Sequence, residues 1–246
     1  MGLRGHKALI TGGGQGIGRA CAEVFASRGA DLVLLDKNTE TLHDVADRVG
    51  RMGINVTARA LDLTDLDRLE SELADIRKSG LIDILVNNAG FDRPGTTEKI
   101  DRQGFEAVLG IHLTVPLFMI RSLLPSMKSA GWGRIVNVSS IYGLIGGKGE
   151  VAYSTAKAGV IGLTKSVAKE CGSEGVTVNA VLPGLTRTPT IETFMADTYK
   201  EIIIAETPLG RIGEAKEVAK VIAFLASNDA SFVTGVALPV SGGWGA

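Results

Sequence analysis

Cysteines, aromatic residues and histidines are scarce in this chain of 246 residues. The two cysteines, Cys21 and Cys171, stand alone in segments with helical periodicity, so we expect small core residues rather than a disulfide or a metal site. The three histidines, His6, His43 and His112, form no ligand cluster. We therefore predict no catalytic metal.

Positive and negative residues are nearly balanced. The formal net charge is −1 and the lysines and arginines are scattered, which argues against a nucleic-acid partner. No run of about 18 apolar residues is evident, so we expect no membrane-spanning segment. The first apolar run begins almost at Met1, which leaves no room for a signal peptide. These absences predict a cytoplasmic protein.

Apolar residues are plentiful, at 45 % of the chain, which is ample for the core of one α/β domain. Short apolar runs alternate with amphipathic segments, a rhythm typical of a doubly wound parallel sheet flanked by helices. The segment 143–149 is expected to be a loop, and two long apolar helices are expected at about 102–128 and 154–173. Seven strands are predicted at residues 6–11, 32–36, 55–61, 82–87, 134–139, 176–181 and 236–240.

A glycine-rich turn, Thr11–Gly18, follows the first predicted strand and precedes a helical stretch. Glycines at such a place let the backbone approach a pyrophosphate, and the helix N-terminus offers free N–H groups to it. The spacing of Gly12, Gly16 and Gly18 is not the usual G-x-G-x-x-G. The order of strand, turn and helix nevertheless favours a dinucleotide site over a plain glycine turn.

Asp36 ends the second predicted strand, about 20 residues beyond the glycines, where the ribose of an adenosine would lie. A carboxylate accepts hydrogen bonds from a 2′-hydroxyl and repels a 2′-phosphate, so Asp36 favours NAD over NADP. The neighbouring Lys37 keeps NADP open, because a cation there could attract the phosphate. An ordinary turn residue before the next helix is the other interpretation of Asp36.

Tyr153 and Lys157 are the candidate catalytic pair. Residues four apart share a helix face, so this spacing places an ammonium beside a phenol. A free phenol has a pKa of about 10, and lowering it to about 7 requires roughly 4 kcal/mol from nearby cations. A partly desolvated lysine and a cationic nicotinamide ring could supply this. A tyrosine so tuned exchanges a proton with an alcohol or a ketone.

The motifs together resemble the short-chain dehydrogenase/reductase family over essentially the whole chain. In order they are Thr11–Gly18, Asp62-Leu63, Asn87–Gly90, Ser140, Tyr153 with Lys157, and Pro183-Gly184. The resemblance implies a single domain with a Rossmann-type fold. It also implies hydride transfer between a nicotinamide dinucleotide and a secondary alcohol or ketone.

The resemblance assigns contacts to the cofactor. Asp62 and Leu63 would border the adenine, and Thr188 would donate to the carboxamide. Lys157 would hydrogen-bond the nicotinamide ribose. The cofactor-binding residues expected in full are Gly12, Gln15, Gly16, Ile17, Gly18, Asp36, Asp62, Leu63, Asn88, Ala89, Gly90, Tyr153, Lys157, Pro183, Gly184, Thr186 and Thr188.

Ser140, thirteen residues before Tyr153, matches the family serine better than Ser139 does. It would hold the substrate oxygen and stabilise charge that develops there. His112 stands where the family usually has asparagine, 28 residues before the serine. A neutral imidazole also carries one donor and one acceptor, so His112 could support a proton relay through Lys157. The equally open alternative is that it only pins the helix backbone.

The segment of about 186–209 resembles the family's substrate lid, which closes over substrate and excludes water. It is largely apolar with a few polar residues such as Tyr199. The best-known relatives reduce 3-oxoacyl groups on an acidic carrier protein and present arginines where this chain has Gly131 and Glu174. A neutral residue and an acid there argue against such a partner.

The prediction is therefore an NAD-dependent alcohol, polyol or sugar dehydrogenase that acts on a small secondary alcohol. The alternative is an NADPH-dependent 3-oxoacyl-[acyl-carrier-protein] reductase. A nucleotide-sensing module without chemistry is disfavoured by the intact Ser140, Tyr153 and Lys157. In relatives the two long helices pack against symmetry mates, which implies a homotetramer, although residues such as Leu123 could equally belong to the intrachain core.

Overall fold

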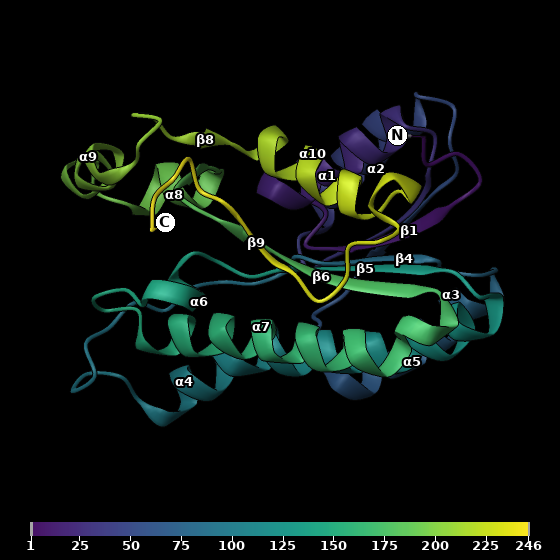
Figure 1. Cartoon of the computed structure of the whole chain (residues 1–246), viewed down its shortest axis with the longest axis horizontal. Helices are drawn as coiled ribbons and strands as arrows, with labels where there is room; N and C mark the ends of the chain where they lie inside the picture. The colour runs from purple at the N-terminus through teal and green to yellow at the C-terminus, as the bar shows by residue number, and fades with distance from the viewer. Residues whose placement is uncertain (1, 246) are drawn as a thin grey trace.

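The computed structural model describes residues 2–245, apart from the side chain of Phe194. Seven parallel strands form one sheet in the order β3-β2-β1-β4-β5-β6-β9 (Figure 1). The predicted seven-stranded α/β fold is confirmed, and each strand lies close to its predicted range. The strands are β1 Lys7–Thr11, β2 Asp31–Asp36, β3 Val56–Ala60, β4 Ile84–Asn87, β5 Gly133–Val138, β6 Val176–Pro183 and β9 Ala237–Val240.

Helices cover both faces of the sheet, as Figure 1 shows. One layer holds α1 (Gly16–Ser27), α2 (Thr39–Gly50) and α10 (Ala215–Leu225). The other holds α3 (Leu66–Lys78), α4 (Arg102–Leu109), α5 (Val115–Ala130) and α7 (Val151–Cys171), and short 3-10 turns occur at Gly172–Glu174 and Asn228–Ala230.

Alternate strand residues supply the two cores. Ile10 and Leu34 are buried on the side of α1 and α10, whereas Leu9 and Val33 are buried on the side of α3 and α5. Side chains of a strand point alternately to its two faces. In a sheet covered on both sides, each strand is therefore a continuous run of apolar residues. Strand order reverses between β1 and β4, and such a switch point opens a crevice at the carboxyl ends of the strands.

The long helix expected at 102–128 is interrupted. A π-helical turn, η1 Gly110–Thr114, separates α4 from α5 and carries His112. Single π-helical turns occur frequently at functional sites. Apolar periodicity gives no signal for this one extra residue per turn, so the interruption was not predicted.

The segment Arg102–Ala130 is long and apolar enough to cross a membrane by length and composition, with 29 residues and a hydropathy of 1.8. The expectation that the chain holds no such stretch is therefore wrong. One helix of this kind is weak evidence, because the core helix of a soluble protein passes the same test. Met119, Leu123 and Met127 are fully buried in the core that α5 shares with the sheet.

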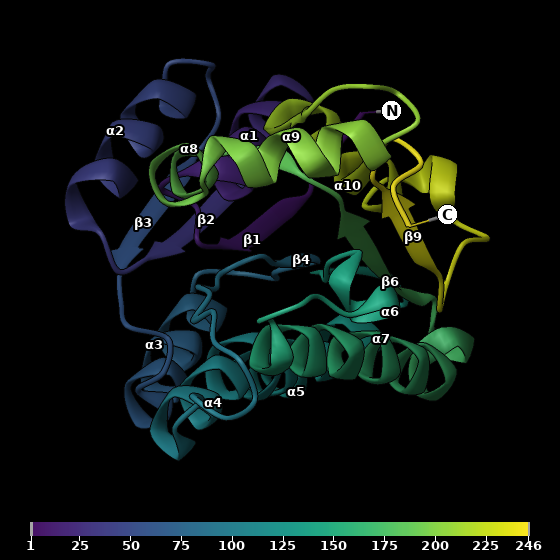
Figure 2. The same ribbon diagram turned by 90° about the vertical axis from the view of Figure 1, so that its left-hand side faces the viewer.

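The chain between β6 and α10 gathers at the end of the molecule where the glycine turn lies. It contains β7 (Thr186–Arg187), α8 (Pro189–Phe194), α9 (Asp197–Glu206) and β8 (Gly213–Glu214), and β7 pairs with β8. Figure 2 shows α8 and α9 at the same end of the molecule as α6 (Tyr142–Ile145). The segment 143–149, predicted as a loop, thus begins in the short helix α6.

Candidate active site

The glycine turn after β1 forms a cradle that only glycine permits. Gly12 and Gly16 have φ values of +66° and +54°. A Cβ at Gly18 would lie 1.9 Å from the Gly12 carbonyl oxygen, and one at Gly12 would lie 2.9 Å from the Cα of Ala89. These positions therefore require a bare backbone.

Helix α1 begins directly behind this turn. Its N-cap residue, Gln15, makes no side-chain capping bond, and its first turn contains no acidic residue. The free N–H groups of such a helix end attract an anion. The turn and helix together fit a dinucleotide pyrophosphate.

Asn88 holds the glycine turn from the neighbouring strand. Its Nδ2 donates to the carbonyl oxygens of Thr11 at 3.0 Å and Gly12 at 3.2 Å, and its backbone N–H donates to Thr11 Oγ1 at 2.9 Å. Ala89 also donates to Thr11 Oγ1, at 3.0 Å. The segment after β4 is thereby fixed against the turn after β1.

The Asp36 carboxylate lies beside the glycine turn. It accepts hydrogen bonds from the backbone N–H of Gly14 at 2.9 Å and of Asn38 at 3.0 Å. The ammonium of Lys37 lies 6.0 Å from the ring centroid of Phe91, and its charge also helps to lower the pKa of Asp62. Asp36 is thus held at the turn by backbone hydrogen bonds.

Asp62, Leu63, Ile17 and Thr188 are the next of the predicted cofactor residues. Asp62 accepts two hydrogen bonds from Thr64, at 2.9 and 2.7 Å, which lower its pKa, and Leu63 is buried. Ile17 packs against the core behind α1. Thr188 caps α8 by accepting from Ile191 N–H, and a Cβ at Gly16 would lie 3.3 Å from its methyl group.

Pro183 ends β6, and the next residue, Gly184, packs against the backbone of Ser241. A Cβ at Gly184 would lie 2.8 Å from Ser241 Cα. Thr186 donates to the Gly184 carbonyl oxygen at 3.0 Å. These contacts fix the chain as it leaves the sheet. They place Thr188 over the glycine turn.

Ser140 and Tyr153 meet beside the crevice. Their side chains share a hydrogen bond, and Ser140 Oγ also accepts from the Tyr142 N–H at 3.2 Å. Ser139 has a different role, because its hydroxyl donates to the Lys157 carbonyl oxygen at 2.7 Å and is buried. The geometry thus favours Ser140 over Ser139 as the serine that faces Tyr153.

Lys157 is buried on the same face of α7. Its Nζ lies 5.3 Å from the centroid of the Tyr153 ring and donates to the Val138 carbonyl oxygen at 2.7 Å. Burial lowers the pKa of Lys157 to about 7. Burial also raises the pKa of Tyr153 above its ordinary value, and only the Ser140 hydrogen bond opposes this. In the protein alone, the lysine therefore does not lower the pKa of the phenol as the spacing predicted.

His112 contacts both Tyr153 and the backbone of Phe91. Its ring lies 5.2 Å from the Tyr153 ring, edge-on, and its Nε2 hydrogen-bonds the Phe91 carbonyl oxygen at 2.7 Å. Nδ1 is buried and has no partner among the described residues. Burial, with the charge of Lys157 second, holds the pKa of His112 well below 6.5. The imidazole is therefore neutral at pH 7.

Four further polar residues lie near this region, and of these the sequence analysis named only Tyr199, as a polar residue of the 186–209 segment. The charges of Asp92 and Glu150 add to burial in raising the pKa of Tyr153. The hydroxyls of Tyr142 and Tyr199 lie 2.7 Å apart, which connects α6 to α9. Of the other three, only Glu150, three residues before Tyr153, offered a local signal.

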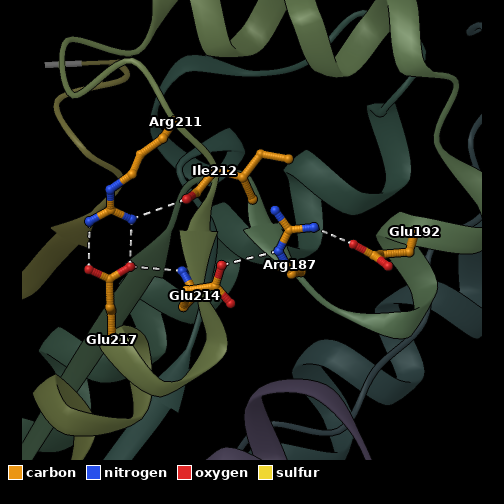
Figure 3. A network of polar contacts seen from close by, with 6 residues as sticks. All are labelled: Arg187, Glu192, Arg211, Ile212, Glu214 and Glu217. Atoms are coloured by element: carbon orange, nitrogen blue, oxygen red, sulfur yellow. Dashed lines mark hydrogen bonds and ion pairs between the residues drawn. The ribbon is translucent and has the colours of Figure 1, made fainter.

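A chain of ion pairs ties the segment after β6 to α10 (Figure 3). Arg187 contacts Glu192 of α8 and, at 3.1 Å, Glu214 of β8. Glu217 accepts the Glu214 N–H at 2.8 Å and binds Arg211 at 2.7 Å. The base of the 186–209 segment is thus anchored by side chains on both of its ends.

Comparison with known proteins covers nearly the whole chain. Residues 12–245 match the family model described as Enoyl-(Acyl carrier protein) reductase. The chain is 38 % identical over 242 residues to the 3-oxoacyl-[acyl-carrier-protein] reductase FabG of Haemophilus influenzae, covering 98 % of each.

Two solved structures are similar at the level of the backbone. A candidate NAD(P)-dependent gluconate 5-dehydrogenase from Beutenbergia cavernae, with NADP bound at low occupancy, has a TM-score of 0.94 at 35 % identity, over 99 % of this chain and 98 % of that one. A 3-oxoacyl (acyl-carrier-protein) reductase from Agrobacterium tumefaciens with NADP bound has a TM-score of 0.94 at 30 % identity, over 99 % and 95 %.

Proposed function

This chain belongs to the short-chain dehydrogenase/reductase family, and we propose that it transfers hydride between NAD and a small secondary alcohol or its ketone. As a member it is an oxidoreductase that acts on a CH–OH or keto group with a nicotinamide dinucleotide. The preference for NAD and the small substrate are our proposal. The observation that carries it is the Asp36 carboxylate at the glycine turn, 2.9 Å from Gly14 N, with the neutral Gln15 beside it.

Bound nicotinamide dinucleotide supplies the hydride acceptor or donor. Ser140 and Tyr153 hold the substrate oxygen, which their shared hydrogen bond supports. Tyr153 takes the hydroxyl proton during oxidation and returns it during reduction. Its raised pKa in the protein alone suits the protonated acid of the reductive direction, and nearby positive charge would favour the phenolate needed for oxidation.

Lys157 positions the nicotinamide ribose and stabilises the phenolate when it forms. Its pKa of about 7 means that either protonation state is accessible near neutrality. His112 holds the Phe91 carbonyl through Nε2, and its bare Nδ1 is an acceptor that a relay water could use. His112 could therefore both hold the backbone and support a proton relay, through different ring nitrogens.

A second candidate function is the reduction of 3-oxoacyl groups on acyl carrier protein. The curated relatives favour it over our first proposal, since the matched Haemophilus influenzae protein carries that name. The residues of this chain argue the other way. Glu174 is bonded to Lys128 at 3.3 Å, and Gly131 ends α5 in a left-handed conformation, so neither presents a free cation to an acidic carrier.

We also propose a cytoplasmic homotetramer. Leu117 of α5 is 46 % exposed and lines a groove with Leu124 and Val167, on the two helices that the family resemblance implicates. Light scattering of the Leu117→Glu variant tests this. A smaller particle than the wild type supports a helix-mediated assembly, and an unchanged mass contradicts it.

The deciding experiment measures absorbance at 340 nm with NAD and NADP against secondary alcohols, polyols and sugars, and with NADH and NADPH against an acetoacetyl thioester. Turnover of a small alcohol with NAD supports the first proposal. Turnover confined to the thioester with NADPH supports the second. Tyr153→Phe should remove nearly all activity while NADH binding stays within a few-fold, and equal loss of both would contradict its role.

A further inference from the structure

We propose that Tyr142 is a positioning residue for the reaction. It connects Ser140 to the segment 186–209, so that the placement of this segment sets the alignment of the Ser140 hydroxyl. The inference rests on the proposed function, because it concerns the serine proposed to hold the substrate oxygen. It goes beyond that function, since it assigns a kinetic consequence to contacts outside the centre formed by Ser140, Tyr153 and Lys157.

The segment 186–209 reaches from the glycine turn to α6. Near its start, Thr188 packs over Gly16, where a Cβ would lie 3.3 Å from the threonine methyl group. Further along, the hydroxyl of Tyr199 in α9 lies 2.7 Å from the hydroxyl of Tyr142 in α6. The segment therefore spans the site from the proposed cofactor side to the proposed substrate side.

Helix α9 has few contacts that hold it in one place. Ile203 is its only buried residue, whereas the base of the segment is anchored by the ion pairs of Figure 3. Regions with few buried contacts open at low cost in free energy. The hydrogen bond between Tyr142 and Tyr199 joins two partly exposed hydroxyls and adds little net free energy. It can therefore break and re-form as α9 moves.

Tyr142 extends this contact to Ser140 through its backbone. The Tyr142 N–H donates to Ser140 Oγ at 3.2 Å, and the Gly143 N–H donates to the Ser140 carbonyl oxygen at 2.9 Å. The Tyr142 ring packs over Gly147, where a Cβ would lie 3.0 Å from the ring atom Cδ1. Because the ring has little room to turn by itself, a displacement of its hydroxyl also displaces the N–H that orients Ser140.

Trp244, beyond β9, braces the connection between the two helices. Its ring stands edge-on against Tyr142, with centroids 5.3 Å apart, and its Nε1 donates to the Glu206 carboxylate of α9 at 3.2 Å. The Trp244 ring is buried in a cluster with Ile141 and Ile203. One side chain thus contacts α6 and α9 together and keeps the two tyrosine hydroxyls within reach of each other.

The alignment of Ser140 bears directly on the hydride step. Because Ser140 Oγ accepts from the Tyr142 N–H, its own proton is left for the substrate oxygen. Small displacements of a group that holds the reacting atoms slow the chemical step strongly. Closure of the segment 186–209 and alignment of the serine are thus coupled through one tyrosine.

The test measures the hydride step in single-turnover stopped-flow reduction of ethyl acetoacetate by NADH. Its first-order rate constant, unlike its amplitude, does not depend on the fraction of enzyme that is folded. We expect Tyr142→Phe and Tyr199→Phe, which keep both rings, each to lower this rate constant by about five- to tenfold. The double variant should lose no more than either single variant, because the two hydroxyls form one contact. A slower reaction with NADH deuterated at the transferred position verifies that hydride transfer is followed.

The two tryptophans of the chain provide a matched pair of variants. Trp244→Phe keeps a ring beside Tyr142 but removes the donor to Glu206, and it should lower the rate constant by about threefold. Trp132→Phe is the control, because Trp132 Nε1 donates to the Asn228 side chain at 3.0 Å and lies just before β5, at the amino ends of the strands. This variant should leave the rate constant unchanged.

The outcomes separate the inference from the proposed function. A rate constant that is unchanged in both tyrosine variants, or that falls in the double variant by the product of the two single losses, overturns the inference and leaves the proposed function standing. An equal effect of the two tryptophan variants overturns the role of Trp244. Failure of the wild type on ethyl acetoacetate with NADH, and on alcohols with NAD, overturns the proposed function and this inference with it.

Discussion

His112 stands edge-on against Tyr153, with ring centroids 5.2 Å apart and ring planes 88° apart. The contact connects the π-helical turn η1 to the residue proposed to move the proton. Because the Phe91 carbonyl can only accept, the proton of the neutral imidazole belongs on Nε2, and Nδ1 is left as an acceptor. The family position usually occupied by asparagine is thus filled by a neutral ring with one fixed donor.

The low pKa of His112 predicts sensitivity to acid. The unfolded chain binds a proton at this histidine near pH 6.5, and the folded protein does so only at lower pH. Stability is therefore full above about pH 6.5 and falls by up to about 1.4 kcal/mol per pH unit below it. Urea unfolding at pH 7.5 and 5.5 should show a smaller loss in His112→Asn than in the wild type. Equal losses in both proteins would contradict this assignment.

The His112 ring leaves no room for a side chain at position 90, which is glycine. A Cβ there would lie 1.9 Å from His112 Cε1, so Gly90→Ala forces a rearrangement that should cost about 1–3 kcal/mol. Gly95→Ala is the control, because its Cβ would meet nothing within 4 Å. Thermal unfolding of Gly90→Ala, His112→Ala and the double variant should show that the two losses are less than additive. Strict additivity would mean that the clash is relieved elsewhere.

The sequence analysis predicted correctly those features that depend on residues close together in the sequence. Buried strands read as apolar runs, and the Tyr153–Lys157 spacing and the glycine turn are local patterns. The interruption at Gly110–Thr114 was missed, because a π-helical turn leaves no mark on apolar periodicity. The backbone bridge between Gly95 and Glu150 was also missed, since only the fold brings these two loops together.

Burial was the other quantity that could not be read from the sequence. Helical spacing correctly put Lys157 beside Tyr153, but it gave no measure of how far both are removed from water. The structure buries them together, and desolvation then opposes charge on each of them. The lowered pKa that was expected of Tyr153 from Lys157 and a cationic nicotinamide ring together is therefore not produced by Lys157 in the protein alone.

Asp36 should decide between the two dinucleotides. Replacing it by asparagine keeps an acceptor for the Gly14 N–H but removes the charge that repels a 2′-phosphate. We expect the kcat/KM ratio to shift toward NADP by at least about tenfold, the equivalent of about 1.4 kcal/mol. Asp31→Asn, at the opposite end of β2, should leave the ratio unchanged.

Lys37→Gln tests the other interpretation of cofactor choice, in which Lys37 attracts the 2′-phosphate of NADP. If Lys37 attracts the phosphate, this variant loses activity with NADP and not with NAD. A ratio that responds to Lys37 and not to Asp36 would contradict the NAD preference proposed above.

Lys157 should make the protein more stable in alkaline solution. The unfolded chain holds a proton at this lysine up to about pH 10.4, whereas the folded protein releases it near pH 7. Since the unfolded state binds more protons between these values, stability rises with pH across that window and is level below it. In Lys157→Met the rise should be absent, while activity is lost, because the proposed ribose contact and the charge beside Tyr153 are removed. Chemical unfolding of both proteins at pH 7, 8 and 9 measures this slope, and a variant that keeps the full wild-type rise would show that another group titrates there.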